Sequence, residues 1–353
     1  MKNNKIKKSK LSNFKNKLDF WATNSEEGGW NISSTDEGSQ KMLENENEKQ
    51  IKIQTGTEVV DDFVIDEDTS DDERMIVNMG PQHPSTHGVL RLQAELEGEV
   101  VRRVKPIIGY LHTGMEKTGE ELNYFQGPTN TTRMDYLSPL FNELVFSLTT
   151  EKLIGIEVPK RAETIRILMT ELNRVSSHLV ALATGGMDIG ALSMMIFGFR
   201  ERELILNFFE KTTGLRMNHN YIRPGGVAAD LPDGWQKDVE EILKIIPEKL
   251  QDYDDMLLDN PIWKGRLQNV GILTTEECFA YGVTGPSLRA SGYSWDLRKS
   301  QPYSGIENYE FDVPTLTEGD VFARWRVKVL EIFESLKIIE QAMNNMPKGP
   351  YKV

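Results

Sequence analysis

The feature that most constrains the fold is a long run of apolar residues at helical spacing in the middle of the chain. After Pro159, apolar residues recur at steps of three and four until Gly185 and Gly186: Ile165, Leu168, Met169, Leu172, Val175, Leu179 and Leu182. A proline before such a run and glycines after it are typical helix boundaries. The pattern predicts a core helix from about residue 160 to the two glycines, and its apolar face needs other elements to cover it.

Neighbouring segments are predicted to cover the apolar face of this helix and to form a small sheet. In the segment from Met75 to Tyr110, the apolar residues Leu90, Leu92, Ala94 and Leu96 alternate with polar ones, which predicts a half-buried hairpin turning near Gly98. We therefore expect a mainly α fold with a small N-terminal antiparallel sheet, an α+β arrangement. Further helices are predicted over residues 136–149, 191–211, 235–258 and 322–343, and Pro247 is expected to kink the third of these.

Composition divides the chain near residue 74. Residues 1–73 begin with seven lysines by Lys17 and end with eight acidic residues between Asp61 and Glu73. Such a segment buries too little apolar surface to offset its ordering entropy, so we expect a disordered tail followed by one domain over residues 74–353. The net charge of -13 argues against nucleic acid as a partner, because phosphate binding needs a basic face.

Neither a membrane span nor a chain-borne metal cluster is expected. The longest apolar stretch, from about Ile189 to Phe199, is much shorter than the roughly 20 residues that cross a bilayer. A single cysteine, Cys278, is too few for an iron-sulfur cluster held by this chain alone. No GxGxxG motif follows a strand, so direct dinucleotide binding is not predicted either.

The segment GPQHPSTHG at residues 80–88 holds the densest group of candidate catalytic or metal-binding residues. Its prolines and glycines prevent a regular helix and place His83 and His87 on a shaped turn. Zinc would need three or four ligands, and the other histidines, His112, His178 and His219, stand in different contexts. The structural alternative is that both imidazoles of the turn satisfy backbone groups. Spacing alone leaves these interpretations open.

Two further candidates lie at the ends of predicted helices. Tyr136 comes just before an apolar helix, where packing is the commoner role, and Asp188 follows the long helix between glycines, where a turn or cap is commoner. Together with the histidines they could reduce a quinone. A quinone must gain two protons as two electrons arrive, and an imidazole, which titrates near 6.5, and a phenol can each donate to one oxygen. The electrons would need a separate redox centre.

A series of motifs resembles the quinone-site subunit of NADH-quinone oxidoreductase, respiratory complex I, and more broadly the fold of nickel-iron hydrogenase large subunits. The resemblance covers about Arg74 to Val353. It rests on NMGPQHPSTHGVLRL, GYLHTGMEK, TTRMDYLSPL, ELNRVSSHLVALATGGMDIGA, RMNHNYIRPGGV, GPSLRASG and DVFARWRVKVLEI, all in the order of the family.

The resemblance implies a set of roles. His87 and Tyr136 would hold the quinone headgroup, Asp188 would partner His87, Thr184 would lie near the pocket, and His83 would shape the turn. Electrons would start at NADH on a distant subunit and arrive from a four-iron four-sulfur cluster held by a neighbour, and proton translocation would be coupled to their transfer. Other implied partners are the adjacent peripheral-arm subunit and the quinone-channel membrane subunit. The expected location is peripheral, on the cytoplasmic side of the inner membrane.

The sequence departs from the family pattern at several positions, and these departures leave alternative functions open. Related hydrogenases bind nickel and iron through two cysteine pairs, which Cys278 cannot supply. Asn218 stands where some family members have a histidine beside the cluster, and His219 follows it. The family normally continues past the sequence PKGPYKV, so we expect a truncated pocket. The alternatives are a non-catalytic scaffold subunit of the same complex, or the equivalent subunit of a ferredoxin- or deazaflavin-dependent quinone reductase.

Overall fold

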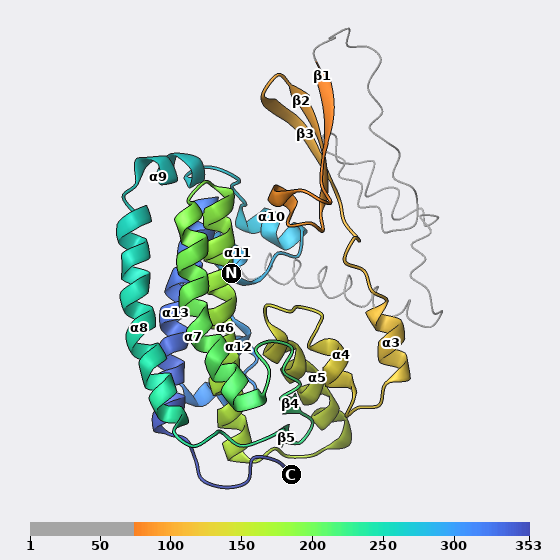
Figure 1. Cartoon of the computed structure of the whole chain (residues 1–353), viewed down its shortest axis with the longest axis vertical. Helices are drawn as coiled ribbons and strands as arrows, with labels where there is room; N and C mark the ends of the chain where they lie inside the picture. The colour runs from red at the N-terminus through yellow and green to blue at the C-terminus, as the bar shows by residue number, and fades with distance from the viewer. Residues whose placement is uncertain (1–73) are drawn as a thin grey trace, which may run out of the picture. The chain divides into compact units, whose positions relative to one another are not determined.

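The structure is a computed structural model that describes residues 74–353. The tail predicted over residues 1–73 lies outside the described residues. Within the described part, long helices form the body and a three-stranded sheet stands at one end (Figure 1). The predicted fold class, mainly α with a small antiparallel sheet near its start, is confirmed.

The centre of the body is helix α6 (Lys160–Asp188), as its periodicity predicts. Its apolar face is fully buried, with Leu168, Leu172 and Leu179 at 0% exposure. Helices α7 (Leu192–Thr213) and α13 (Val321–Asn344) pack along it, and α8 (Trp235–Leu257) packs against both of these (Figure 1). Helix α8 continues through Pro247. The four helices together bury most of the main core.

The predicted end of α6 lies two residues too early. The helix runs past Gly185 and Gly186 and ends at Asp188, so this aspartate is the last helical residue rather than part of a loop. Close packing explains the glycines: a Cβ on Gly186 would lie 2.7 Å from the Cβ of Met194 on α7. Here glycine permits contact between helices instead of ending one.

The sheet contains the predicted hairpin and one additional strand. Strands β2 (Arg91–Glu97) and β3 (Val100–Ile107) are antiparallel and turn at Gly98, whose φ is +59°. Strand β1 (Arg74–Met79) pairs with the other edge of β2, giving the order β1-β2-β3. The half-buried character is confirmed for β2, whereas most of β3 is exposed.

Shorter elements complete the described part of the chain. The predicted helix 136–149 is α5 (Pro139–Ile154), which begins three residues later than expected. The other elements carry too few residues to show a period. They are η1 (Pro84–Thr86), α3 (Met115–Glu121), α4 (Gly127–Thr131), β4 (Ile222–Arg223), β5 (Gly226–Val227), α9 (Pro261–Leu267), α10 (Thr275–Ala280), α11 (Gly285–Ala290), α12 (Leu297–Ser300) and η2 (Ile306–Asn308).

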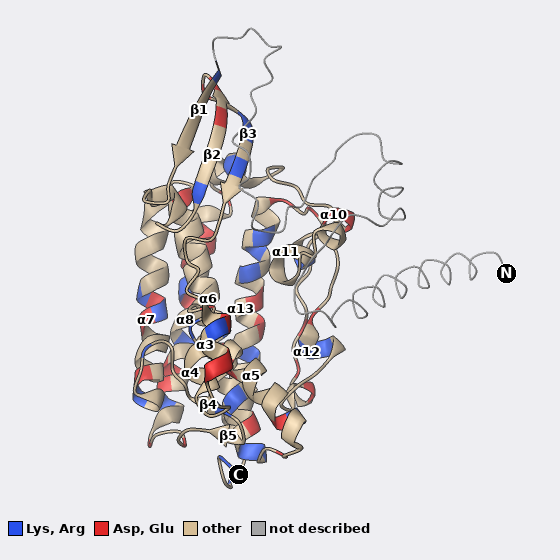
Figure 2. Ribbon diagram, turned by 90° about the vertical axis from the view of Figure 1, so that its right-hand side faces the viewer, with Lys and Arg blue, Asp and Glu red and all other residues tan. Residues whose placement is uncertain are grey.

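Among residues 74–353, no helix is both long and apolar enough to cross a membrane. Figure 2 shows acidic and basic residues mixed along α7, where both colours occur on the same helix. The elements that matter most for the site are η1, the turn before α5, and α6, because these three carry every residue for which the sequence predicts a role at a quinone.

Candidate functional site

The turn that carries the two histidines is held together by its own residues. Thr86 is 2% exposed, and its hydroxyl lies 3.2 Å from the carbonyl oxygen of Pro81 and 3.1 Å from that of His83. Gly80 has a φ of +85°, and a Cβ at this position would lie 2.1 Å from the carbonyl oxygen of Leu90. The turn therefore requires glycine there and presents its histidines from a fixed backbone.

His83 serves the turn itself. Its Nδ1 accepts a hydrogen bond from the backbone N–H of Ser85 at 3.2 Å and lies 2.6 Å from the Ser85 hydroxyl. The structural interpretation of the motif is thus confirmed for this histidine. Because Nδ1 is occupied by donors, only Nε2 of His83 is left to face a ligand.

His87 is oriented differently. It closes η1 in the left-handed conformation, with a φ of 52°, and its Nε2 lies 3.2 Å from Oδ2 of Asp188. Both side chains are partly open, at 47% and 41% exposure. Within residues 74–353, Nδ1 of His87 has no hydrogen-bond partner. The imidazole therefore has one nitrogen on a carboxylate and the other free at the surface.

Tyr136 lies in the turn that precedes α5, and its side chain is 44% exposed. The turn is fastened to α6: the Asn173 side chain donates to the carbonyl of Leu137 at 2.9 Å and accepts from the amide of Leu140 at 3.1 Å. Nothing in the described residues hydrogen-bonds the Tyr136 hydroxyl. This phenol is thus held at its backbone and free at its polar tip.

Helix α6 runs between the turn that carries Tyr136 and the His87–Asp188 pair. In the second half of α6, Ser177, Ala181, Thr184, Gly185 and Asp188 are at least partly exposed and share one face of the helix. From Ser177 to Asp188 the helix rises about 16 Å. Thr184 lies one turn before Asp188 on this face, and its hydroxyl donates to the carbonyl of Val180 at 2.8 Å. The accessible face is lined by small side chains between the tyrosine turn and the His87–Asp188 pair.

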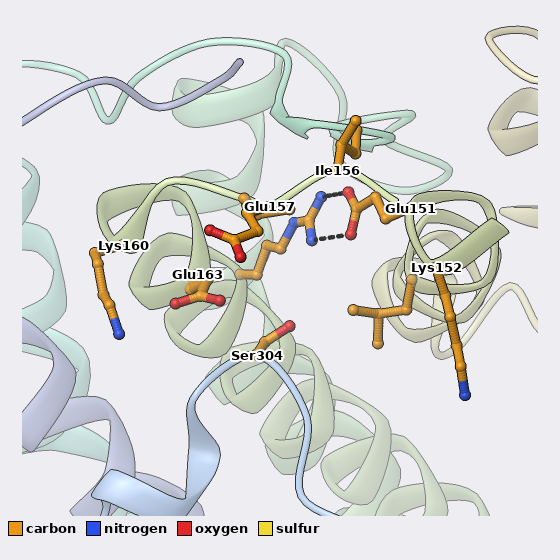
Figure 3. A pocket seen from close by; sticks show the side chains of 10 residues that line it. Glu151, Lys152, Ile156, Glu157, Lys160, Glu163 and Ser304 are labelled. Carbon is orange, nitrogen blue, oxygen red and sulfur yellow. Dashed lines mark hydrogen bonds and ion pairs between the residues drawn. The ribbon is translucent and has the colours of Figure 1, made fainter. Parts of the chain in front are cut away.

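A separate cavity lies far from these residues along α6. It has a volume of about 430 Å³ and opens at the beginning of α6, the opposite end from Asp188, and Figure 3 shows its charged lining. Arg166 and Glu151 form a buried ion pair there, with Nη1 3.0 Å from Oε2. None of the residues predicted to form a site lines this cavity, and its walls carry both lysines and glutamates.

The other histidines are dispersed. In the described part of the chain, no group of three or more His, Cys, Asp and Glu residues is arranged to hold a metal ion. His219, which follows Asn218, is buried edge-on against Phe209, and its Nδ1 lies 3.0 Å from the carbonyl of Leu215. Burial lowers the pKa of His219 to about 4. His219 therefore faces the core and stays neutral.

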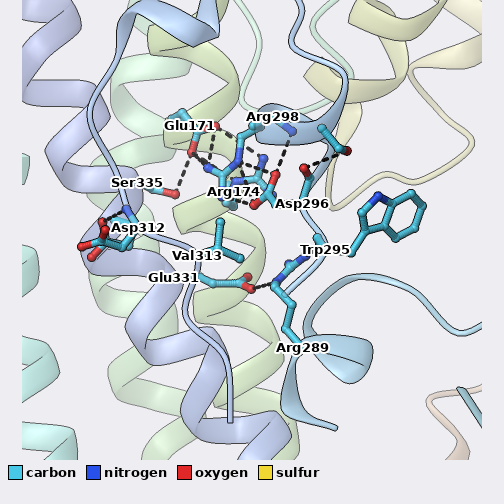
Figure 4. Close-up of polar contacts among 12 residues, drawn as sticks. Glu171, Arg174, Arg289, Trp295, Asp296, Arg298, Asp312, Val313, Glu331 and Ser335 are labelled. Atoms are coloured by element: carbon cyan, nitrogen blue, oxygen red, sulfur yellow. Dashed lines mark hydrogen bonds and ion pairs between the residues drawn. The ribbon is translucent and has the colours of Figure 1, made fainter. Parts of the chain in front are cut away.

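A buried ionic network links α6 to α13. On α6, Glu171 accepts from Arg298 at 3.1 Å, Arg174 at 3.1 Å and Ser335 at 2.7 Å, and Figure 4 shows these side chains converging. Asp296 adds a second carboxylate to Arg298 at 2.7 Å. The signal in the sequence is a set of charged residues interrupting an apolar helical run, because buried charges need partners.

Further along α6, His178 and Arg289 share the carboxylate of Glu331. The distances are 2.7 Å from His178 Nε2 and 2.6 Å from Arg289 Nε. Arg289 and Arg298 thus each have a buried carboxylate partner.

Asp320 and Arg324, in the motif DVFARWRVKVLEI, form hydrogen bonds with backbone groups. Asp320 caps α13 by accepting from the amide of Ala323 at 2.7 Å. Arg324 donates to the carbonyls of Gly319 and Gly271 at 2.6 and 2.7 Å. Both residues therefore fasten the beginning of α13 to the loops beside it.

Comparisons with known proteins agree with these motifs. Residues 188–353 match the model of the family described as respiratory-chain NADH dehydrogenase, 49 kDa subunit. A D-type subunit of NADH-quinone oxidoreductase from Mycobacteroides abscessus is 54% identical over 306 residues, which are 86% of this chain and 71% of the relative. The chain belongs to this family. The predicted family resemblance is thereby confirmed, and the fold is consistent with the hydrogenase large-subunit type.

Other relatives are at least as similar but are covered over a smaller share. A D-type subunit of NADH-quinone oxidoreductase from Salinispora arenicola is 59% identical over 288 residues, 81% of this chain and 65% of the relative. The corresponding protein from Rhodococcus jostii is 59% identical over 281 residues, 79% of this chain and 64% of the relative. The chain thus spans about 65% of the length of these relatives.

Proposed function

We propose that this member of the 49 kDa subunit family forms one wall of a quinone-reduction site, between the His87–Asp188 pair and Tyr136. The observation that carries the proposal is the 3.2 Å contact between Nε2 of His87 and Oδ2 of Asp188, made by two partly exposed side chains. An accessible imidazole that is oriented by a carboxylate has the arrangement of a proton donor.

The hydrogen bond to Asp188 fixes which nitrogen of His87 is left for a ligand. A neutral imidazole carries one proton, and with that proton on Nε2 toward the carboxylate, Nδ1 can only accept. A protonated imidazole also has an Nδ1–H, which is free to donate to a quinone oxygen. Asp188 thus orients the ring, and the protonated ring is the form that delivers a proton.

Tyr136 supplies the second donor. Its hydroxyl is unpaired among the described residues and can donate to the other quinone oxygen. The small side chains of Ala181 and Thr184 and the bare Gly185 leave the intervening face of α6 open to a flat ring. In the net reaction the quinone gains two electrons and two protons, and water that reaches both partly exposed donors replaces the protons they give up.

The electrons come from outside this chain in the proposed reaction. A four-iron four-sulfur cluster on a neighbouring subunit would supply them one at a time, after NADH is oxidised on a more distant subunit. This chain cannot supply the cluster ligands, since its one cysteine, Cys278, is buried and donates to the hydroxyl of Ser291 at 3.4 Å. We propose a peripheral position on the cytoplasmic side of the inner membrane, beside the quinone-channel subunit, with quinone reduction coupled to proton translocation.

The test replaces Tyr136 in the assembled complex. We expect Tyr136→Phe to lower inhibitor-sensitive quinone reduction by about tenfold to a hundredfold, because only a proton-donating hydroxyl is lost. NADH oxidation by an artificial acceptor, which bypasses the quinone site, should stay unchanged. Tyr293→Phe is the matched control, since Tyr293 is 45% exposed and packs on Phe279 of α10. Unchanged quinone turnover in Tyr136→Phe would rule out the proposed donor.

A further inference from the structure

The side chain that fixes the tyrosine turn is Asn173, which is 2% exposed on α6. Its Nδ2 donates to the carbonyl of Leu137 at 2.9 Å, and its Oδ1 accepts from the amide of Leu140 at 3.1 Å. These two backbone groups lie on either side of Ser138, and Leu137 directly follows Tyr136. One buried amide therefore holds the backbone immediately after the phenol at two points.

The bond to Leu140 replaces a missing helix cap. The first amides of a helix have no partner within the helix, and a side chain at the N-cap usually accepts from one of them. In α5 the N-cap is Ser138, and its side chain makes no capping hydrogen bond. Asn173 performs that task from another helix. An amide side chain both donates and accepts here, whereas a carboxylate lacks the donor and an aliphatic side chain lacks both groups.

The same helix carries the other end of the proposed site. Asp188 lies fifteen residues after Asn173 on α6, a rise of about 22 Å along one continuous helix. The core face of this helix is fully buried against α7 and α13, so neither end can shift independently without disturbing close packing. The position of the tyrosine turn relative to Asp188 is thus set by a single rigid element.

We propose that Asn173 is a positioning residue for Tyr136, and that through it α6 sets the spacing between Tyr136 and Asp188, the carboxylate that orients His87. The inference rests on the proposed function, because it concerns the placement of a donor at that site. A displacement of about 1 Å of a reacting group can cost about a hundredfold in rate. Loss of the two Asn173 bonds therefore acts on quinone turnover through the position of Tyr136 and not only through stability.

The experiment is a double-mutant cycle in the assembled complex, with Asn173→Ala, Tyr136→Phe and both together. We expect Asn173→Ala alone to lower kcat/KM for quinone about tenfold. In the Tyr136→Phe background the same change should cost less than about twofold, because the hydroxyl whose position matters is already absent. Equal losses in both backgrounds would overturn the inference.

Controls separate positioning from general destabilisation. Ser176→Ala removes another buried polar bond between α6 and a neighbour, the 3.1 Å bond from Arg202, and should leave kcat/KM unchanged in either background. If Asn173→Ala fails to assemble, Asn173→Asp replaces it in the cycle. Aspartate keeps the acceptor for Leu140 at a helix N-terminus, where a negative charge is favourable, and replaces the donor to Leu137 by a second acceptor that repels its carbonyl oxygen. The same non-additivity is expected from it.

Each outcome has a distinct meaning. If Tyr136→Phe alone leaves turnover unchanged, the proposed function fails and the inference fails with it. If Tyr136→Phe lowers turnover while the Asn173 variants lose the same factor in both backgrounds, the inference alone fails and Asn173 is only a helix cap. Non-additive losses with an unaffected Ser176→Ala control support both.

Discussion

Two histidine-carboxylate pairs in this molecule have the same chemistry and opposite surroundings. His178 and Glu331 lie 2.7 Å apart, with side chains 11% and 1% exposed. His87 and Asp188 lie 3.2 Å apart, with side chains 47% and 41% exposed. Both pairs link α6 to an element distant in sequence, α13 in the first case and η1 in the second. Their surroundings, rather than their chemistry, distinguish them.

The buried pair has its bonding groups committed to the core. Burial lowers the pKa of His178, although its hydrogen bond to Glu331 opposes this shift. Burial alone would raise the pKa of Glu331, but the bond from His178 and the charge of Arg289 outweigh it and hold the pKa at about 2. The carboxylate is therefore ionised and shared between two partners. Such a pair fixes the packing of α6 on α13 and has no face left for a substrate.

The open pair has spare bonding capacity. His87 meets one carboxylate through Nε2, and its Nδ1 has no partner among residues 74–353. An exposed pair of this kind contributes at most about 1 kcal/mol to stability, so its orientation matters more for chemistry than for folding. The comparison indicates that burial decides whether a histidine-carboxylate pair serves structure or is available to a ligand.

The largest expected effect comes from breaking the buried pair. Glu331→Gln leaves the buried guanidinium of Arg289 without its counter-charge, and we expect a loss of about 3–5 kcal/mol in the free energy of unfolding. Urea unfolding followed by tryptophan fluorescence would measure it, because Trp263 and Trp325 pack edge to face in the core, 5.7 Å apart. In Asp188→Asn the change should stay within about 1 kcal/mol. Similar losses of unfolding free energy in Glu331→Gln and Asp188→Asn would contradict the proposed difference between the buried and the exposed pair.

A smaller loss of folding stability is expected when the pH is lowered. The carboxyl pKa values of Glu331 and Asp296 are each held at about 2, below the ordinary 4.5 and 3.8, so the folded state binds fewer protons than the unfolded state. This stability is present above about pH 4.5 and is lost as the pH falls toward 2. The lowered pKa of His178 acts in the same direction, since the unfolded chain takes up that proton first below pH 6.5.

We expect Glu331 to contribute about 2 kcal/mol to this acid-dependent loss, because one unit of pKa shift corresponds to about 1.4 kcal/mol and the paired groups share the effect. Unfolding free energies measured at about pH 6, 4.5 and 3 would test it across the window in which the carboxyl titrates. In Glu331→Gln the slope over the acidic half of that range should be shallower, whereas Asp188→Asn should keep the slope of the unaltered chain. A slope that is independent of Glu331 would show that other carboxylates cause the acid loss.

The sequence predicts those parts of the fold that have a period. The long helices and the hairpin follow from spacing, because burial of one face selects apolar residues every three to four or every second position. The end of α6 was misplaced because Gly186 is required by Met194, which lies on another helix. That information depends on tertiary contact and has no local signature. Helices as short as α10 and α11, with six residues each, give no period either.

The site could be predicted only in part, for a similar reason. Local sequence cannot distinguish His83 from His87, since both lie in one motif, whereas in the structure His87 has a left-handed backbone and its ring contacts Asp188, 101 residues away. The pairing of His87 with Asp188 is expected only from the family resemblance. Asn173 was not predicted at all, although a lone amide in an apolar helical run is a signal that some backbone group needs it.

The smallest expected effect lies in the chemistry of the open pair. Asp188→Asn keeps the shape of the side chain and removes the negative charge that faces Nε2 of His87. We expect quinone reduction per assembled complex at neutral pH to fall about fivefold, since an exposed ion pair is worth up to about 1 kcal/mol. Glu331→Gln is the matched control: it breaks the buried pair and should leave quinone reduction per assembled complex unchanged. Equal turnover in Asp188→Asn and in the unaltered chain would show that the carboxylate charge does not assist proton donation by His87.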